Sequence, residues 1–314
     1  MTRVLDALER SPAVCDIVHL PGAARRPEGD LVLCDVAREA ASIVLLDLEE
    51  MGVHERGSIT IERPEAVLSH AAERAERAVP GDSTNAVVWE EVEELTQEST
   101  ELSVSFLIFM TLATLITAVG IFLDSPILIV GGMVLGPEFG PLASFAVAIV
   151  QGRTALARRS LLALLAGFPL AIGAVFLASL FFKWTGVAPD TFTEEDHGFS
   201  KLISNPDFFS FFVAFCAGIA GTLSLTTAKS GALTGVLISV TTIPAAANVG
   251  VSAAYSDWSA MGGSIAQLAI NLSVLCVAGV GTLLVQRAIF RHRRADYLRG
   301  HGERPERGRP PLLR

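Results

Sequence analysis

Residues 125–152 read SPILIVGGMVLGPEFGPLASFAVAIVQG and contain a single charged side chain, that of Glu138. A hydrocarbon core about 30 Å thick is crossed by roughly 20 apolar helical residues, so this stretch is long enough to span a membrane. Five further segments are of similar length and carry no charge: 102–123, 160–182, 208–228, 230–256 and 258–286. Buried helices of a large soluble protein are the alternative, but such helices are usually shorter. The sequence therefore predicts a membrane α-helical protein with six transmembrane helices.

Charge divides the chain into three regions. The first 100 residues hold 9 Arg, no Lys and 21 acidic residues, a net charge of −12, whereas residues 287–314 hold 9 Arg and 3 acidic residues. A domain this acidic binds nucleic acid poorly, so we expect no nucleic-acid partner. We predict a cytosolic domain over 1–82, a helical linker over 83–101, a six-span membrane domain over 102–290 and a basic, disordered tail over 291–314.

Basic residues at the ends of the spans predict the orientation in the membrane. Arg153, Arg158 and Arg159 lie between the second and third spans, and further arginines follow the sixth span. The segment between the third and fourth spans is acidic instead. We therefore expect a multi-pass protein of the plasma membrane (the inner membrane of a bacterial cell), with its N- and C-termini in the cytosol.

The N-terminal region has shorter apolar runs. Residues 15–20, 30–36 and 58–62 are rich in Val and Ile and read as strands. Between the last two of these, residues 37–52 read as a helix ended by Gly52, and residues 64–78 read as a second, amphipathic helix with a proline in its first turn. This βαββα order predicts a small α+β domain of the ferredoxin-like type.

The polar residues form no recognisable catalytic or cofactor motif. The chain has no phosphate-binding loop, dinucleotide fingerprint or HExxH pattern, and its predicted spans contain no histidine. The four cysteines, Cys15, Cys34, Cys216 and Cys276, are not spaced as a metal-binding or redox pair. We therefore expect no enzyme activity, no catalytic residue, no cofactor and no metal site.

The apolar region repeats itself with an offset of 103 residues. In this register Phe106 aligns with Phe209, and Pro141 aligns with Pro244. The same register aligns all three spans of each half, so the predicted repeats are 102–183 and 207–288. Because each repeat has three spans, the second repeat enters the membrane from the opposite side, which is the inverted arrangement of many transporters.

The middle span of each repeat has residues that weaken a helix. Proline removes a backbone donor and glycine lowers helix stability, and backbone groups freed in this way must face protein, water or a solute. We expect two broken helices that meet at a solute site; two kinked, closely packed helices without a ligand are the alternative. A charge at this depth is costly, which makes Glu138 the foremost candidate. The candidate binding residues are Glu138, Gly136, Pro137, Gly140, Pro141, Ser239, Thr241, Thr242, Pro244 and Asn248.

Two motifs, GGMVLGPEFGPLASF (131–145) and GVLISVTTIPAAANVG (235–250), resemble a bacterial and archaeal family of integral membrane proteins described as an uncharacterised hydrophobic domain of unknown function. The resemblance covers most of the chain, and it implies a small cytosolic α+β domain joined to a six-span body. Glu138 stands where this family usually has an apolar residue, and Pro244 keeps one of two adjacent prolines. The resemblance implies no substrate.

These features favour a membrane transporter or channel for a small solute or ion, regulated by the cytosolic domain. A membrane sensor or scaffold that transports nothing is the first alternative, and a membrane enzyme is the second. We expect the partners to be the lipid bilayer, a small solute and a cation or proton. Glycine-rich spans that allow close contacts, together with a small α+β domain, further predict a homo-oligomer.

Overall fold

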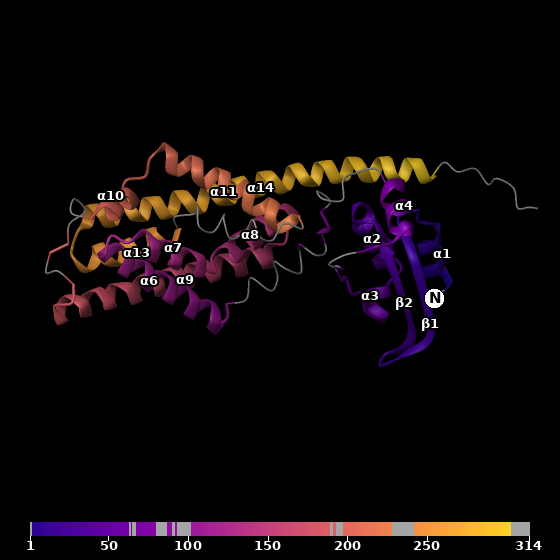
Figure 1. The fold of residues 1–314 in the computed structure, drawn as a ribbon, viewed down its shortest axis with the longest axis horizontal. Helices are drawn as coiled ribbons and strands as arrows, with labels where there is room; N and C mark the ends of the chain where they lie inside the picture. The colour runs from indigo at the N-terminus through magenta and orange to yellow at the C-terminus, as the bar shows by residue number, and fades with distance from the viewer. Residues whose placement is uncertain are drawn as a thin grey trace, which may run out of the picture. The chain divides into compact units, whose positions relative to one another are not determined.

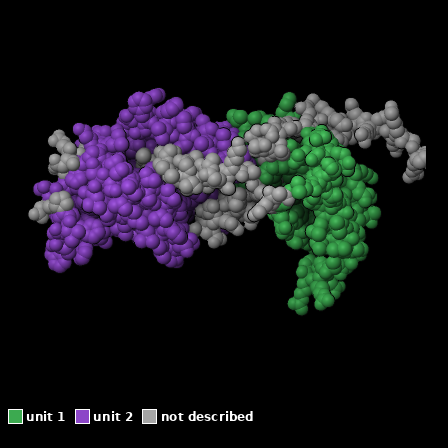
Figure 2. All heavy atoms as spheres, viewed as in Figure 1, with its two compact units in different colours: residues 1–92, 285–314 green, residues 93–284 purple. Residues whose placement is uncertain are grey.

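The computed structural model describes residues 2–62, 64, 67–79, 87–89, 92, 102–188, 191–192, 197–227 and 242–302, with side chains up to residue 292. The chain forms two compact units (Figures 1 and 2). Unit 1 comprises residues 1–92 and 285–314, and unit 2 comprises residues 93–284. The C-terminal helix contributes residues to both units, because it runs from Trp258 to Gly302.

Unit 1 is built around an antiparallel β-hairpin. Strand β1 (Val14–Arg25) pairs with β2 (Glu28–Val36), with Val14 opposite Val36 at the open end of the hairpin. The helices of its N-terminal segment are α1 (Thr2–Arg10), the 3-10 turn η1 (Arg38–Ala40), α2 (Ala41–Glu50), α3 (Val53–Arg56) and α4 (His70–Ala78). Apolar residues, among them Ala40, Ile43 and Ala75, form its core, and Phe290 of the C-terminal helix packs against them.

Three features of unit 1 differ from the sequence prediction. Residues 58–62 form no strand, so the described sheet has two strands and the βαββα order of a ferredoxin-like fold is not found. Helix α4 begins at His70, not at Pro64, because the Ser69 hydroxyl accepts hydrogen bonds from the N–H groups of Ala71 and Ala72. Helix α1 was not predicted.

Unit 2 is helical throughout its described regular structure. Its helices are α6 (Val104–Phe122), α7 (Pro126–Leu135), α8 (Phe139–Gln151), α9 (Thr154–Thr185), α10 (Gly198–Ser204), α11 (Phe208–Thr226), α13 (Thr242–Ala254) and the first part of α14 (Trp258–Gly302). Helices α6, α9 and α13 pack against one another, α7 packs against α6, and α8 packs against α9 (Figure 1). Apolar side chains of these helices, including Met110, Phe168 and Ile243, fill the core.

Four described helices are long and apolar enough to cross a membrane: α6, α9, α11 and α14. Helices α7 and α8 together pass the same test, and they bend by 48° at the break between them, so the described residues hold four to five candidate spans. Residues 230–241 of the predicted fifth window lie outside the described residues, and α13 occupies most of the remainder. The chain thus has the apolar helices of a membrane protein.

The C-terminal end of the chain also differs from the prediction. We expected a disordered tail from residue 291, but α14 continues as a helix through Gly302. The predicted linker, residues 83–101, lies almost entirely outside the described residues.

Candidate functional site

The candidate site begins at the break between α7 and α8. Helix α7 ends at Leu135, and Gly136 leaves the helical conformation with φ −65° and ψ 123°. Pro137 follows and has no N–H to continue the helix. Glu138 is the N-cap residue of α8, which starts again at Phe139. The predicted break in the second span is therefore present, and Glu138 lies in it.

Pro141 has a different role from the one expected, because it is the third residue of α8. The first four N–H groups of a helix have no partner within it, so a proline there removes no helical hydrogen bond. Pro141 therefore begins α8, and the break before α8 is made by Gly136 and Pro137. Pro244 lies in the described part of α13, and the residues before Thr242, where the second break was expected, lie outside the described residues.

Glu138 is buried and is held by a residue from the other half of the membrane region. Its side chain is only 4% exposed, and its Oε1 accepts a hydrogen bond of 2.6 Å from the Thr242 hydroxyl. Oε2 is also buried and has no hydrogen-bond partner among the described residues. No lysine or arginine of the described chain pairs with this carboxylate. One carboxylate oxygen is thus left without a donor from the part of the chain that the structure describes.

The backbone at Gly136 allows α13 to approach this carboxylate closely. A Cβ atom added at Gly136 would overlap Glu138 Oε2, and it would lie 2.7 Å from Cγ1 of Ile243. Real Cβ atoms do not come this close to other atoms. The absence of a side chain at Gly136 therefore lets the break and the first turn of α13 meet.

Asn248 belongs to a second buried polar cluster. It lies six residues after Thr242, which places it about 9 Å further along α13. Its Oδ1 accepts a 2.9 Å hydrogen bond from the Ser200 hydroxyl, and its Nδ2 donates a 2.8 Å hydrogen bond to the Ser264 hydroxyl. Asn248, Ser200 and Ser264 are all fully buried. This cluster joins α10, α13 and α14.

The predicted site residues thus divide into three groups. Gly136, Glu138 and Thr242 come together, with Pro137, Gly140, Pro141 and Pro244 on the backbone beside them. Asn248 lies in the second cluster. Ser239 and Thr241 lie outside the described residues.

The sequence analysis missed the two serines that bind Asn248. Ser264 had a usable signal, because it is one of several polar residues inside an uncharged predicted span. Ser200 gave no such signal, because it lies in the polar stretch between the third and fourth predicted spans. Its contact with Asn248 arises only from the tertiary structure.

In unit 1 the hairpin brings together three side chains that the sequence analysis did not connect. Potential ligand atoms of Cys15, Asp16 and Asp35 lie within 4.8 Å of one another. Burial, and then the charges of the two carboxylates, raise the pKa of the Cys15 thiol. A raised pKa disfavours the thiolate, which is the form of cysteine that binds metals.

Comparison with known proteins agrees with the resemblance seen in the motifs. Residues 133–277 match the family described as "Domain of unknown function (DUF389)". The chain is also similar to the uncharacterized protein MJ0678 of Methanocaldococcus jannaschii, with 26% identity over 196 residues. That alignment covers 61% of this chain and 58% of the relative, so the chain spans little more than half of the relative's length. No solved structure matches the chain.

Proposed function

We propose that this chain, whose residues 133–277 carry a domain of unknown function, is a transporter or channel that moves a small solute or ion across the plasma membrane. The observation that carries the proposal is the hydrogen bond between Glu138 and Thr242. It joins a buried carboxylate in a helix break to a residue of α13, 104 positions later in the chain. Buried ionisable groups within membrane helices are costly and mark pathways for ions, protons or solutes.

The proposed architecture has six spans arranged as two inverted repeats. Helices α8 and α13 support it, because their ends, Gln151 and Ala254, differ by 103 residues. The bounds of α6 and α11, and the starts of α9 and α14, differ by 104 residues. Two such repeats, each with three spans, place both termini in the cytosol with Arg153, Arg158 and Arg159.

In the proposed mechanism the Glu138 carboxylate exchanges a proton or small cation with the transported solute. Thr242 fixes one carboxylate oxygen by donating to it, and Oε2 is left to accept a proton or to bind a cation. A carboxylate removed from water requires such a counter-charge, since no basic side chain of the described residues supplies one. Binding of a proton or cation to Glu138 would then change the contact between the α7–α8 break and α13.

We also propose that the protein is a homo-oligomer. In unit 1 the pairs Val18–Leu33 and Leu20–Leu31 lie side by side across the hairpin, and all four side chains are exposed. A two-stranded hairpin with an uncovered apolar face is marginally stable by itself. In the proposal this apolar face binds a second copy of the domain. A scaffold protein that transports nothing would use the same face to hold its subunits together.

Proton and cation flux into liposomes tests the proposal. Purified protein is reconstituted with an entrapped pH-sensitive dye, and flux of protons, Na⁺ and K⁺ is measured across a pH series. Wild-type protein should conduct, and Glu138→Gln should lose the dependence on pH or cation because it keeps the size of the side chain and removes the charge. Asp207→Asn, which alters a cap at the start of α11, is the matched control and should keep that dependence.

Two outcomes would count against the proposal. If wild-type liposomes pass none of these ions faster than empty liposomes, and none of a broad set of small solutes, the scaffold alternative is favoured. If the Glu138→Gln variant conducts with unchanged pH and cation dependence, Glu138 is a buried structural residue of the helix break and takes no part in conduction.

A further inference from the structure

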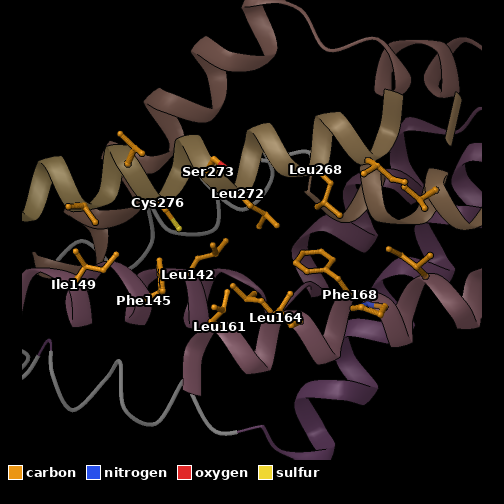
Figure 3. Close-up of a pocket in the computed structure, with 17 residues that line it drawn as sticks. Leu142, Phe145, Ile149, Leu161, Leu164, Phe168, Leu268, Leu272, Ser273 and Cys276 are labelled. Atoms are coloured by element: carbon orange, nitrogen blue, oxygen red, sulfur yellow. The ribbon is translucent and has the colours of Figure 1, made fainter. Parts of the chain in front are cut away.

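An apolar groove of about 780 Å³ runs along unit 2 between α9 and α14, with α8 contributing to its wall. Figure 3 shows Leu161, Leu164 and Phe168 of α9 on one side, and Leu268 and Leu272 of α14 on the other. Among the 17 lining residues, only Ser273 and Cys276 carry a hydroxyl or thiol. A groove of this composition selects a hydrocarbon ligand.

The size of the groove matches one acyl chain. Its volume is within the range of about 300–1,000 Å³ that is typical of small-ligand sites. Along α9 it is lined from Leu161 to Ile172, a distance of about 16 Å at the helical rise per residue. One leaflet of a bilayer has a hydrocarbon depth of about 15 Å, half of the whole core. The groove is therefore as long as one leaflet is deep.

The groove is open to its surroundings along its length. Leu165 is 60% exposed and Val277 is 70% exposed, although both line it. An uncovered apolar groove forgoes the dispersion contacts that a filled one makes. In a membrane protein, the surroundings that fill such a groove are lipid tails.

A basic residue lies in line with one end of the groove. Arg158 precedes Leu161 by three residues and Leu165 by seven, so the three side chains share one face of α9. Arg158 is exposed and forms no ion pair with any described residue. A guanidinium binds the oxygens of a phosphate through two parallel N–H groups.

We propose that this groove is a binding site for an anionic phospholipid, with one acyl chain between α9 and α14 and the headgroup phosphate on Arg158. The site is separate from the exchange of ions at Glu138, and it stands whether or not the protein transports. A second copy of the chain fits the groove less well. Two copies related by a two-fold axis through the groove would face each other with Arg158, and like charges oppose such an interface.

Native mass spectrometry of the full-length protein tests the proposal. The protein is purified in mild detergent from membranes that contain phosphatidylglycerol and phosphatidylethanolamine, and the lipid bound to each chain is identified. Wild-type protein should retain phosphatidylglycerol in preference to phosphatidylethanolamine. Arg158→Gln should weaken that retention about tenfold, the loss expected for one charge-assisted hydrogen bond. Arg159→Gln, next to it on a different face of α9, is the matched control and should retain lipid normally.

A second pair of variants tests the groove itself. Leu165→Trp and Leu161→Trp fill the groove with an indole and should abolish retention of both lipids. Leu177→Trp changes an exposed leucine of the same helix outside the groove, and it should leave retention unchanged. Thermal melting of each variant confirms that it is folded, since all three leucines are partly or largely exposed.

The proposal is overturned if wild-type protein retains no phospholipid, or if the groove variants retain as much as Leu177→Trp. It is also overturned if Leu165→Trp converts a lipid-free dimer into monomers, because the groove would then be an interface between two copies.

Discussion

Thr242 donates a 2.6 Å hydrogen bond to Glu138, and so links the N-cap residue of α8 to α13. Helices α8 and α13 end 103 residues apart, at Gln151 and Ala254. The bond therefore connects two helices that correspond in the predicted repeats. A substitution at either residue should therefore alter the packing around the other.

Removal of the Thr242 hydroxyl should destabilise the protein. Thr242→Val keeps the shape of the side chain but leaves Glu138 Oε1 buried without its donor, at a cost of about 1–3 kcal/mol. The measurement is thermal unfolding in detergent, where the midpoint should fall. Thr242→Ser keeps the hydroxyl and should unfold near the wild-type temperature; equal midpoints for Val and wild type would show that the bond adds no stability.

Gly136→Ala should separate the break from α13. The added methyl group would press on Glu138 and on the side chain of Ile243, and such overpacking costs about 1–3 kcal/mol. Gly131→Ala is the control, because a methyl group there meets no other atom within 4 Å. We expect a lower unfolding temperature for Gly136→Ala only. An unchanged midpoint for both variants would contradict the close approach.

Asn248→Ala should destabilise the second polar cluster. It leaves the buried hydroxyls of Ser200 and Ser264 without their partner on α13, and each unpaired group costs about 1–3 kcal/mol. Chemical denaturation in detergent should show a loss of this size. Asn205→Ala, at the exposed end of α10, should have a much smaller effect. If the two substitutions cost the same, burial does not govern the contribution of Asn248.

The hairpin of unit 1 should lose stability in acid through Asp30. The Gly22 N–H, and after it His19, holds the pKa of Asp30 below its ordinary value. A lowered pKa means that the charged form stabilises the folded state above the ordinary aspartate pKa, and that this contribution is lost as the pH falls through the folded-state value. Asp30→Asn should therefore unfold earlier than wild type at neutral pH, with the two midpoints converging in acid. A difference that grows as the pH falls would contradict this assignment.

The proposed orientation can be read from the two ends of α9. In a cysteine-free background, Arg159→Cys should react with a membrane-impermeant thiol reagent only after the cells are opened. Thr185→Cys, at the other end of the helix, should react in intact cells. Labelling of Arg159→Cys in intact cells would show that the orientation in the membrane is the opposite of the one proposed.

Much of the membrane region could be predicted because apolar length is a local property. The predicted windows 102–123 and 160–182 correspond to α6 and α9. The break at Gly136 and Pro137 could be predicted because glycine and proline weaken a helix in any sequence. The N-terminal domain was predicted less well. Residues 58–62 alternate like a strand, but a strand requires a neighbouring partner, which no local pattern specifies.

By itself the sequence determined that this chain has helices apolar and long enough to span a membrane, that its second predicted span breaks before α8, and that Glu138 lies in the break. Charge, hydropathy and backbone freedom are properties of individual residues. The tertiary structure alone decided which residues meet there. Thr242 reaches Glu138, Ser200 reaches Asn248, and α9 and α14 enclose an apolar groove, through packing between segments far apart in the chain. Such contacts depend on how helices approach one another, and the order of residues within one helix does not fix that approach.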